Sequence, residues 1–158
     1  MIKKEWKPHD KQKQFIQIPH SILEGFYGGS AGAGKSELLL MLPIIYGWFK
    51  RAGFKGLIVR RTFAELESEI ILRSKEFYRY TGAKYNEGKK RWTWEWPDGE
   101  AYIQFGHAEH EEDIRKYDTA EYNYIAFDEM TSFTEFQYQY LAFSRCRSSI
   151  PGLPAIVR

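Results

Sequence analysis

The stretch Gly29-Ser30-Ala31-Gly32-Ala33-Gly34-Lys35-Ser36 fits the pattern G-x-x-x-x-G-K-[ST] at every fixed position. In this pattern the glycines let backbone N–H groups close around phosphates, because a Cβ at Gly29 or Gly34 would block the path. Lys35 is expected to reach the β- and γ-phosphates, and Ser36 to offer its hydroxyl to Mg²⁺. The stretch therefore predicts a site for a nucleoside triphosphate, against the alternative of a flexible glycine-rich turn.

The sequence on both sides of this stretch supports the prediction, because a phosphate loop lies between a strand and a helix. The sequence predicts a short strand at residues 23–28, before the loop. Residues 38–49 are apolar on nearly all sides, which is typical of a helix buried between two layers. Pro43 lies inside this helix, where it removes the hydrogen bond to the carbonyl of Leu39 and is expected to cause a kink.

An apolar strand that ends in two carboxylates is the second feature of a nucleotide hydrolase. Residues 122–127 have this character and are followed by Asp128 and Glu129. Asp128 is expected to hold Mg²⁺, directly or through water, together with Ser36. Glu129 is placed to orient and deprotonate a water that attacks the γ-phosphate, which favours hydrolysis over transfer to an alcohol. An Asp-Glu pair alone is more often a solvated strand end, and the upstream phosphate loop favours the functional interpretation.

Length and composition place this site in a small globular protein. The chain has 158 residues, 43% of them hydrophobic, which is enough for one domain with a single packed core. A formal net charge of +2 does not by itself indicate a nucleic-acid binder. The single cysteine, Cys146, excludes an intramolecular disulfide, and the sequence contains no signal peptide or apolar run of transmembrane length. We therefore expect a soluble protein in a reducing compartment, with no membrane partner.

Strand and helix signals alternate along the rest of the chain. Residues 57–59 form a continuous apolar run typical of a buried parallel strand, and this run ends in Arg60 and Arg61. An amphipathic helix is predicted over about residues 64 to 80, and a final helix over about residues 133 to 145. The alternation predicts an α/β fold with a mainly parallel sheet flanked by helices.

Three tryptophans mark an antiparallel hairpin inserted into this fold. Trp92, Trp94 and Trp96 alternate with other residues, and a second alternating run follows the turn at residues 97–99. Exposed aromatic side chains could stack on nucleic-acid bases. Alternate aromatic residues in a hairpin more often pack one face onto the core, so we expect a structural role for the tryptophans.

Histidine and acidic residues gather at residues 107–113. Their spacing matches no zinc pattern, although the residue types alone could suggest a metal site. A solvated acidic turn that leads into a short helix is the favoured interpretation.

Three segments of the chain occur together in an informative order: residues 28–36 (GGSAGAGKS), 58–63 (IVRRTF) and 124–133 (YIAFDEMTSF). In this order they resemble the ATPase domain of the large terminase subunits of tailed bacteriophages, over about residues 11–147. The resemblance implies a P-loop NTPase fold and Mg²⁺-dependent ATP hydrolysis that powers the packaging of double-stranded viral DNA into procapsids. It also implies the portal protein, the small terminase subunit and further copies of the chain in a ring as partners, in the host cytoplasm.

The resemblance assigns roles to residues outside these segments. An adenine-contacting glutamine is expected in a Lys-Gln-x-x-Phe context, which Gln12 fits first and Gln14 second. An amide suits adenine because it donates and accepts at once. Asp118 occupies the position expected for the arginine finger, so we assign the finger to Arg115. The other basic candidates are Lys116, Arg60 and Arg145.

The chain differs from the family in extent. No nuclease domain follows Glu129, and residues 153–158 read like a core strand with nothing after it. We expect residues 1–158 to be a P-loop ATPase domain truncated at its C-terminal end, and slow or inactive on its own.

One alternative function is that of a small P-loop kinase, against which Glu129 argues. The other is a nucleotide-binding or assembly module without turnover.

Overall fold

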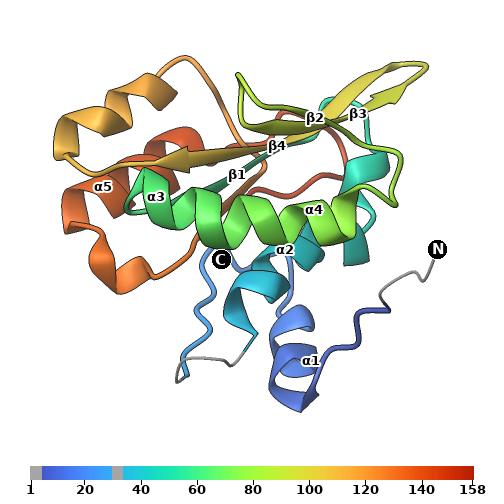
Figure 1. Ribbon diagram of the computed structural model, residues 1–158, viewed down its shortest axis with the longest axis horizontal. Coiled ribbons are helices and arrows are strands. Elements are labelled where there is room, and N and C mark those ends of the chain that lie inside the picture. The colour runs from blue at the N-terminus through green and yellow to red at the C-terminus, as the bar shows by residue number, and fades with distance from the viewer. Residues whose placement is uncertain (1–4, 30–33) are drawn as a thin grey trace.

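The computed structural model describes residues 5–29 and 34–158 of the chain. The strands of this part are β1 (Lys55–Arg60), β2 (Lys84–Asn86), β3 (Arg91–Trp96), β4 (Gly99–His107), β5 (Tyr124–Phe127) and β6 (Ile156–Val157). They form a six-stranded sheet in the order β2-β3-β4-β1-β5-β6 (Figure 1). Neighbours from β4 through β6 pair in parallel, whereas β3 is antiparallel to both β2 and β4. The predicted mainly parallel sheet is confirmed, and β6 lies within the strand expected at residues 153–158.

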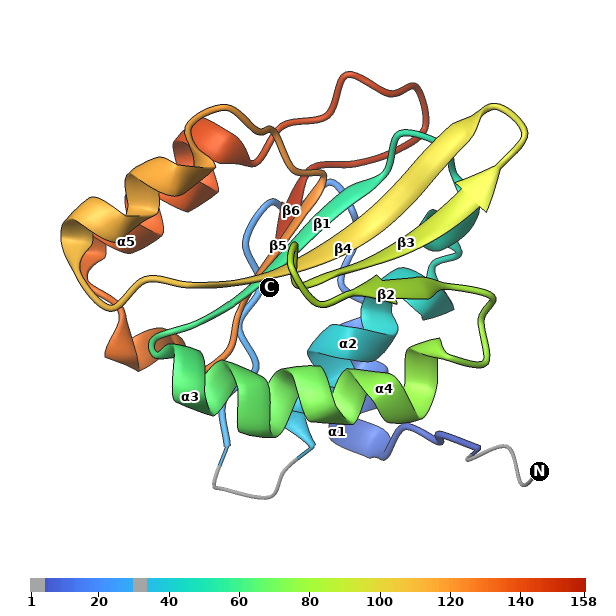
Figure 2. The same cartoon turned by 45° about the horizontal axis from the view of Figure 1, so that its top comes forward.

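Helices lie on both faces of the sheet (Figure 2). The α-helices are α1 (Asp10–Ile16), α2 (Lys35–Ile45), α3 (Phe63–Glu65), α4 (Leu72–Tyr78) and α5 (Glu135–Gln139). A π-helical segment, Leu66–Ile71, joins α3 to α4, and a second, Tyr140–Arg145, continues α5. Helices α2, α3 and α4 cover one face and α5 covers the other. Helices were predicted over about residues 64–80 and 133–145, where α3, α4 and α5 lie, but the two π-helical segments were not predicted.

The central strand β1 explains why two helical layers are needed. Ile58 packs into the apolar cluster on the α2 side, whereas Leu57 and Val59 pack into the cluster that contains Leu141. Successive side chains of a strand point to opposite faces, so a strand covered on both sides reads as a continuous apolar run. The polar residues Arg60 and Asp128 lie where β1 and β5 end.

The predicted antiparallel hairpin is formed by β3 and β4 and belongs to the main sheet. Its second strand, β4, pairs in parallel with β1, which brings Phe105 opposite Ile58. Trp92 and Trp94 are buried and Trp96 is partly buried against the same cluster, so the predicted core role is confirmed. Each indole N–H finds an acceptor at 2.8 Å: Ser74 Oγ for Trp92, Thr81 Oγ1 for Trp94 and the Phe49 carbonyl for Trp96.

The prediction of a strand over residues 23–28 is wrong. Within this segment Glu24 alone forms a bridge, parallel to Val157 of β6, and the N–H of Gly25 donates to the Val157 carbonyl at 3.1 Å. Gly25 has no side chain to pack, and Phe26 remains 53% exposed, so little burial holds the segment against the sheet. The chain therefore reaches the phosphate loop beside β6 without becoming a full strand.

Helix α2 continues through Pro43 and ends at Ile45. Because proline has no N–H, the carbonyl of Leu39 loses its partner inside the helix. The hydroxyl of Tyr124 in β5 donates to this carbonyl at 2.8 Å. A side chain of the sheet thus replaces the missing helical hydrogen bond, and it links α2 to the strand that precedes Asp128.

Gly106 is expected to be the glycine of the sheet that least tolerates a side chain. A Cβ at this position would lie 2.0 Å from the hydroxyl oxygen of Tyr117 and 2.8 Å from its Cζ. Tyr117 is buried and donates to the His107 carbonyl at 3.1 Å, so the ring has little room to move. Gly106→Ala should lower the free energy of unfolding by about 1–3 kcal/mol, measured by urea denaturation.

Gly88→Ala is the matched control for this prediction, because the nearest atom to a Cβ there is Asn86 Oδ1 at 3.4 Å. Equal midpoints for the two variants would show that Tyr117 does not restrict position 106.

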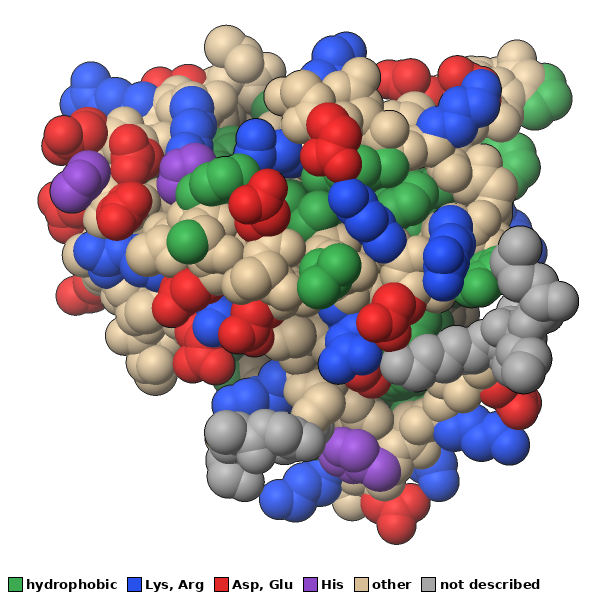
Figure 3. Space-filling model, in the orientation of Figure 1, with side chains coloured by type: hydrophobic (Ala, Val, Ile, Leu, Met, Phe, Trp, Pro, Cys, Tyr) green, Lys and Arg blue, Asp and Glu red, His purple; other side chains and the backbone are tan. Residues whose placement is uncertain are grey.

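The surface carries mixed charge. Figure 3 shows acidic and basic side chains interspersed over one face, in line with the net charge of +2. The segment that follows His107 contains the short helix that the sequence predicted, the 3₁₀-helix η3 (Glu111–Tyr117). Among the described residues no helix is long and apolar enough to cross a membrane. Cys146 is buried, and this burial raises the pKa of its thiol to about 12.

Candidate nucleotide site

The two ends of the phosphate loop have the geometry that the sequence pattern requires. Gly34 caps α2 with a φ of 67°, and a Cβ there would lie 2.6 Å from Nε2 of Gln12, so glycine is needed for two reasons. Lys35 is the first residue of α2, and its Nζ donates to the carbonyl of Gly29 at 2.9 Å. The lysine side chain therefore spans the loop. The predicted loop contacts that lie outside the described residues are Ser30, Gly32 and Ala33.

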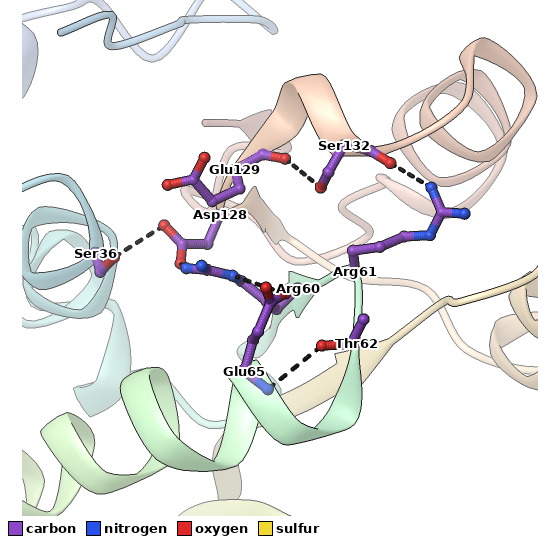
Figure 4. A network of polar contacts seen from close by, with 8 residues as sticks. All are labelled: Ser36, Arg60, Arg61, Thr62, Glu65, Asp128, Glu129 and Ser132. Carbon is purple, nitrogen blue, oxygen red and sulfur yellow. Dashed lines mark hydrogen bonds and ion pairs between the residues drawn. The ribbon is translucent and has the colours of Figure 1, made fainter. Parts of the chain in front are cut away.

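Ser36 and Asp128 meet across the fold although they are far apart in sequence. Oγ of Ser36 donates to Oδ1 of Asp128 at 2.9 Å (Figure 4). Asp128 directly follows β5 and is 3% exposed, and its N–H donates to the carbonyl of Val59 at 2.9 Å. Hydroxyl and carboxylate oxygens are ligands that Mg²⁺ accepts, usually beside phosphate oxygens and water. The pair therefore provides the oxygen donors that Mg²⁺ bound with a nucleotide needs.

Glu129 has an unusual backbone conformation. Its φ of 57° and ψ of 55° lie in the left-handed region, which non-glycine residues adopt at a cost of about 1 kcal/mol or more. Such strained residues cluster at functional sites. The side chain is exposed, and its carboxylate points to the same side as Ser36 and the Asp128 carboxylate in Figure 4. The turn therefore presents one buried and one exposed carboxylate to the phosphate loop.

Two cavities adjoin the phosphate loop, and Lys35 and Glu129 line both. One has a volume of about 410 Å³ and is also lined by Tyr27 and Arg158. The other has a volume of about 710 Å³ and is also lined by Arg60 and residues of α4. These volumes are in the range of small-molecule sites. The lysine and the exposed carboxylate therefore face space that a ligand of nucleotide size can enter.

Gln12 lies against the phosphate loop. Its side chain is 3% exposed, its Nε2 donates to the Gly34 carbonyl at 2.9 Å, and its Oε1 accepts from the His9 N–H at 3.0 Å. Gln14, the second candidate, is exposed on the same helix. A glutamine amide has two N–H donors and two acceptor lone pairs, and the described residues engage one of each in Gln12. The structure thus brings Gln12 into contact with Gly34 of the loop, whereas the Gln14 side chain is exposed.

The candidates for the arginine finger lie in different places. Arg115 and Lys116 belong to η3, whose residues line neither of the two cavities in the described part of the chain. Arg145 donates through Nη1 to the carbonyl of Asp118. Arg60 alone among the four lines a cavity at the loop, and its Nη1 donates to Oδ2 of Asp128.

The contact of Arg60 with Asp128 was not predicted from the sequence. Burial alone lowers the pKa of Arg60. The hydrogen bond to Asp128 and the charge of that carboxylate raise the pKa and outweigh burial, so the pKa lies above its usual value. The signal that could have revealed the contact is topological. Arg60 ends β1 and Asp128 follows β5, and the carboxyl ends of neighbouring parallel strands meet at one edge of the sheet.

Two more cavity residues carried no sequence signal. Tyr27 packs edge-on against Phe15 with ring centroids 5.5 Å apart. Arg158 is 3% exposed, and its Nη1 donates to the carbonyls of Ile22 at 3.3 Å and Leu23 at 3.2 Å. Their roles depend on contacts between distant segments, which neither spacing nor composition encodes.

The mainly parallel sheet, the loop at the start of α2 and the acidic residue after β5 define a P-loop NTPase fold. The sequence matches the family described as terminase large subunit, T4likevirus-type, N-terminal, over residues 26–149. The chain therefore belongs to the terminase large subunit family, as the resemblance predicted. No curated relative matches the sequence.

Solved structures support the fold. The large terminase from a thermophilic bacteriophage has a TM-score of 0.70 at 18% identity, covering 94% of this chain and 37% of that chain. A complex of that protein with ATP-gamma-S gives a TM-score of 0.65, also at 18% identity, over 94% of this chain and 36% of that one. The Thermus phage P74-26 large terminase ATPase domain gives 0.61 at 16% identity, over 96% of this chain and 64% of that one. The chain thus spans little more than a third of the first of these terminases.

Proposed function

We propose that this chain binds Mg²⁺-ATP at the phosphate loop and hydrolyses it as the ATPase domain of a viral large terminase. The observation that carries the proposal is the contact between Ser36 and Asp128, which joins the loop to the end of β5. Lys35 would hold the β- and γ-phosphates, and Gln12 would contact the adenine. Structures of the thermophilic phage terminase with ADP and with ATP-gamma-S support a nucleotide as the ligand.

Mg²⁺ fits the hydroxyl of Ser36 and the carboxylate of Asp128. When bound there, the ion supplies positive charge that offsets the phosphate oxygens. Gly29, Gly34 and the loop between them would surround the phosphates with backbone N–H groups, and the N-terminus of α2 would add its dipole. The chain's own groups thus bind and orient the triphosphate before any bond breaks.

Hydrolysis fits the site better than phosphoryl transfer to a metabolite. The exposed carboxylate of Glu129, which lines both cavities as Lys35 does, would take a proton from the attacking water. A carboxylate directly after Asp128 is placed to activate a water, which argues against a small P-loop kinase. A binding or assembly module without turnover would need neither the carboxylate nor its conformation.

Family membership further supports a packaging motor as the context of this ATPase. The proposed partners are double-stranded viral DNA, the portal protein and the small terminase subunit, with several copies of the chain in a ring. The proposed location is the host cytoplasm, at the procapsid. Arg115 is exposed on η3 and lines neither of the two cavities described at the phosphate loop, which suits an arginine finger donated to a neighbouring copy.

A steady-state assay of phosphate release tests this function. We expect slow turnover at low protein concentration, and a rise of at least about tenfold per subunit on adding portal protein and double-stranded DNA, because a donated finger can be worth about 10³–10⁵ in rate. Arg115→Ala should abolish this rise and leave ATP affinity unchanged. Arg79→Ala removes an arginine that lies over the Tyr80 ring and serves as the control.

Two results would count against the proposal. Absence of phosphate release under every condition would leave only the binding module. A rise that survives in Arg115→Ala would reject Arg115 as the finger and leave the ATPase function in place.

A further inference from the structure

Arg60 is a buried cation at the proposed metal site. Its side chain is 10% exposed, and its Nη1 donates to Oδ2 of Asp128 (Figure 4). The other carboxylate oxygen, Oδ1, already accepts from Ser36 at 2.9 Å. Both oxygens of Asp128 are therefore engaged, and the negative charge that a metal would use is balanced by an arginine.

A second carboxylate lies within reach of the same arginine. Oε2 of Glu65 is 3.6 Å from Nε of Arg60, which makes an ion pair but exceeds hydrogen-bond length. Nε of Arg60 is buried and has no hydrogen-bond partner among residues 5–29 and 34–158. Glu65 belongs to the short helix α3, and its side chain is 51% exposed, so it can move. A small rotation would let Arg60 exchange Asp128 for Glu65.

Mg²⁺ at Ser36 and Asp128 would conflict with the arginine in its present position. Two cations would share one buried carboxylate, and like charges a few ångströms apart repel strongly where water is scarce. A buried charge that loses its partner is also costly, so Arg60 needs another acceptor if it leaves Asp128. Glu65 is placed to be that acceptor.

We propose that Arg60 is an exchangeable counter-ion of Asp128: it holds the carboxylate in place without Mg²⁺ and turns to Glu65 when Mg²⁺-nucleotide binds. The inference rests on the proposed function, because it requires a nucleotide at the phosphate loop. Arg60 acts here as a positioning residue through Asp128. The positive charge of Arg60 sets the Mg²⁺ concentration that nucleotide binding requires.

The proposal predicts opposite effects for the two partners of this exchange. Arg60→Met removes the competing cation, so less Mg²⁺ should be needed. Glu65→Gln removes the alternative acceptor, so Arg60 should hold Asp128 more firmly and more Mg²⁺ should be needed. A general loss of structure at the site would weaken binding in both variants and cannot produce opposite signs.

Calorimetric titration of the whole chain with ATP-gamma-S, in EDTA and over a series of Mg²⁺ concentrations, measures this requirement. We expect the Mg²⁺ concentration that gives half of the affinity gain to fall about tenfold in Arg60→Met and to rise several-fold in Glu65→Gln, since groups around metal ligands change affinity by about 10–100-fold. Arg61→Met is the matched control. Arg61 donates to the carbonyls of Glu109 and Ser132, so its loss removes an adjacent charge without touching Asp128.

The outcomes separate this inference from the function it rests on. A parent protein that binds no nucleotide with or without Mg²⁺ would overturn both. A parent that binds, with an unchanged Mg²⁺ requirement in Glu65→Gln, would overturn the exchange alone. Because Glu65 is half exposed, this variant keeps the test decisive even if Arg60→Met does not fold.

Discussion

Lys35→Ala should lower the affinity for ATP by about 100-fold or more while the protein stays folded, because loss of one partner of a desolvated charge pair costs about 2–5 kcal/mol. Lys35 is the only cation in residues 29–36, and its Nζ spans the loop to the Gly29 carbonyl. Alanine at the start of α2 preserves the helix, since it has the highest helix propensity. Calorimetric titration with ATP and Mg²⁺ measures the loss.

Lys89→Ala is the control for this variant. It removes the same charge from an exposed turn between β2 and β3, so its ATP affinity should equal that of the parent. If Lys35→Ala binds ATP within a few-fold of the parent, the phosphate-loop assignment is wrong.

Glu129→Gln should bind Mg²⁺-ATP as tightly as the parent and hydrolyse it about 10²–10⁴-fold more slowly, the usual contribution of a general base. The amide has nearly the shape of the carboxylate but cannot take a proton from water. Because the side chain is exposed and the backbone conformation is unchanged, the fold should keep its stability. Single-turnover measurement of pre-bound ATP separates the chemical step from binding.

The matched control is Glu112→Gln, an exposed glutamate in η3 that lines neither cavity at the loop. Turnover of Glu129→Gln within a few-fold of the parent would show that another group, or water alone, accepts the proton.

Much of the fold could be predicted from local pattern. The apolar run at residues 57–59 marked a strand covered on both faces, and the alternating tryptophans marked a hairpin. Both signals arise because burial on a given face demands apolar residues at a fixed period. The wrong prediction of a strand at residues 23–28 has the same origin. A segment that is held by one bridge and buries little surface has no strong apolar periodicity in its sequence.

The π-helical segments could not be predicted, because they change hydrogen bonding by one residue and leave the apolar pattern almost unaltered. The replacement of the Leu39 hydrogen bond by Tyr124 was hidden for another reason. A proline shows which carbonyl is left without a partner, and only the packed sheet shows which side chain supplies one.

For the site, the motifs predicted which residue types would meet but not how they are paired. The spacing of the loop and of Asp128 and Glu129 predicted a phosphate site with an acidic partner, and the structure brings Ser36 and Asp128 into contact. The pairing of Arg60 with Asp128 depends on β1 and β5 being neighbours. Strand order is a property of the whole chain, so a local pattern does not reveal it.

The most direct test of the account is paramagnetic line broadening in NMR spectra of the chain with ADP and Mn²⁺ in place of Mg²⁺. Broadening should be strongest at Ser36, Asp128 and Glu129. It should be weak at Phe49 and Trp96, which line a separate cavity of about 780 Å³. Broadening centred on that separate cavity, or spread evenly over the surface, would contradict a metal-nucleotide site between the phosphate loop and the end of β5.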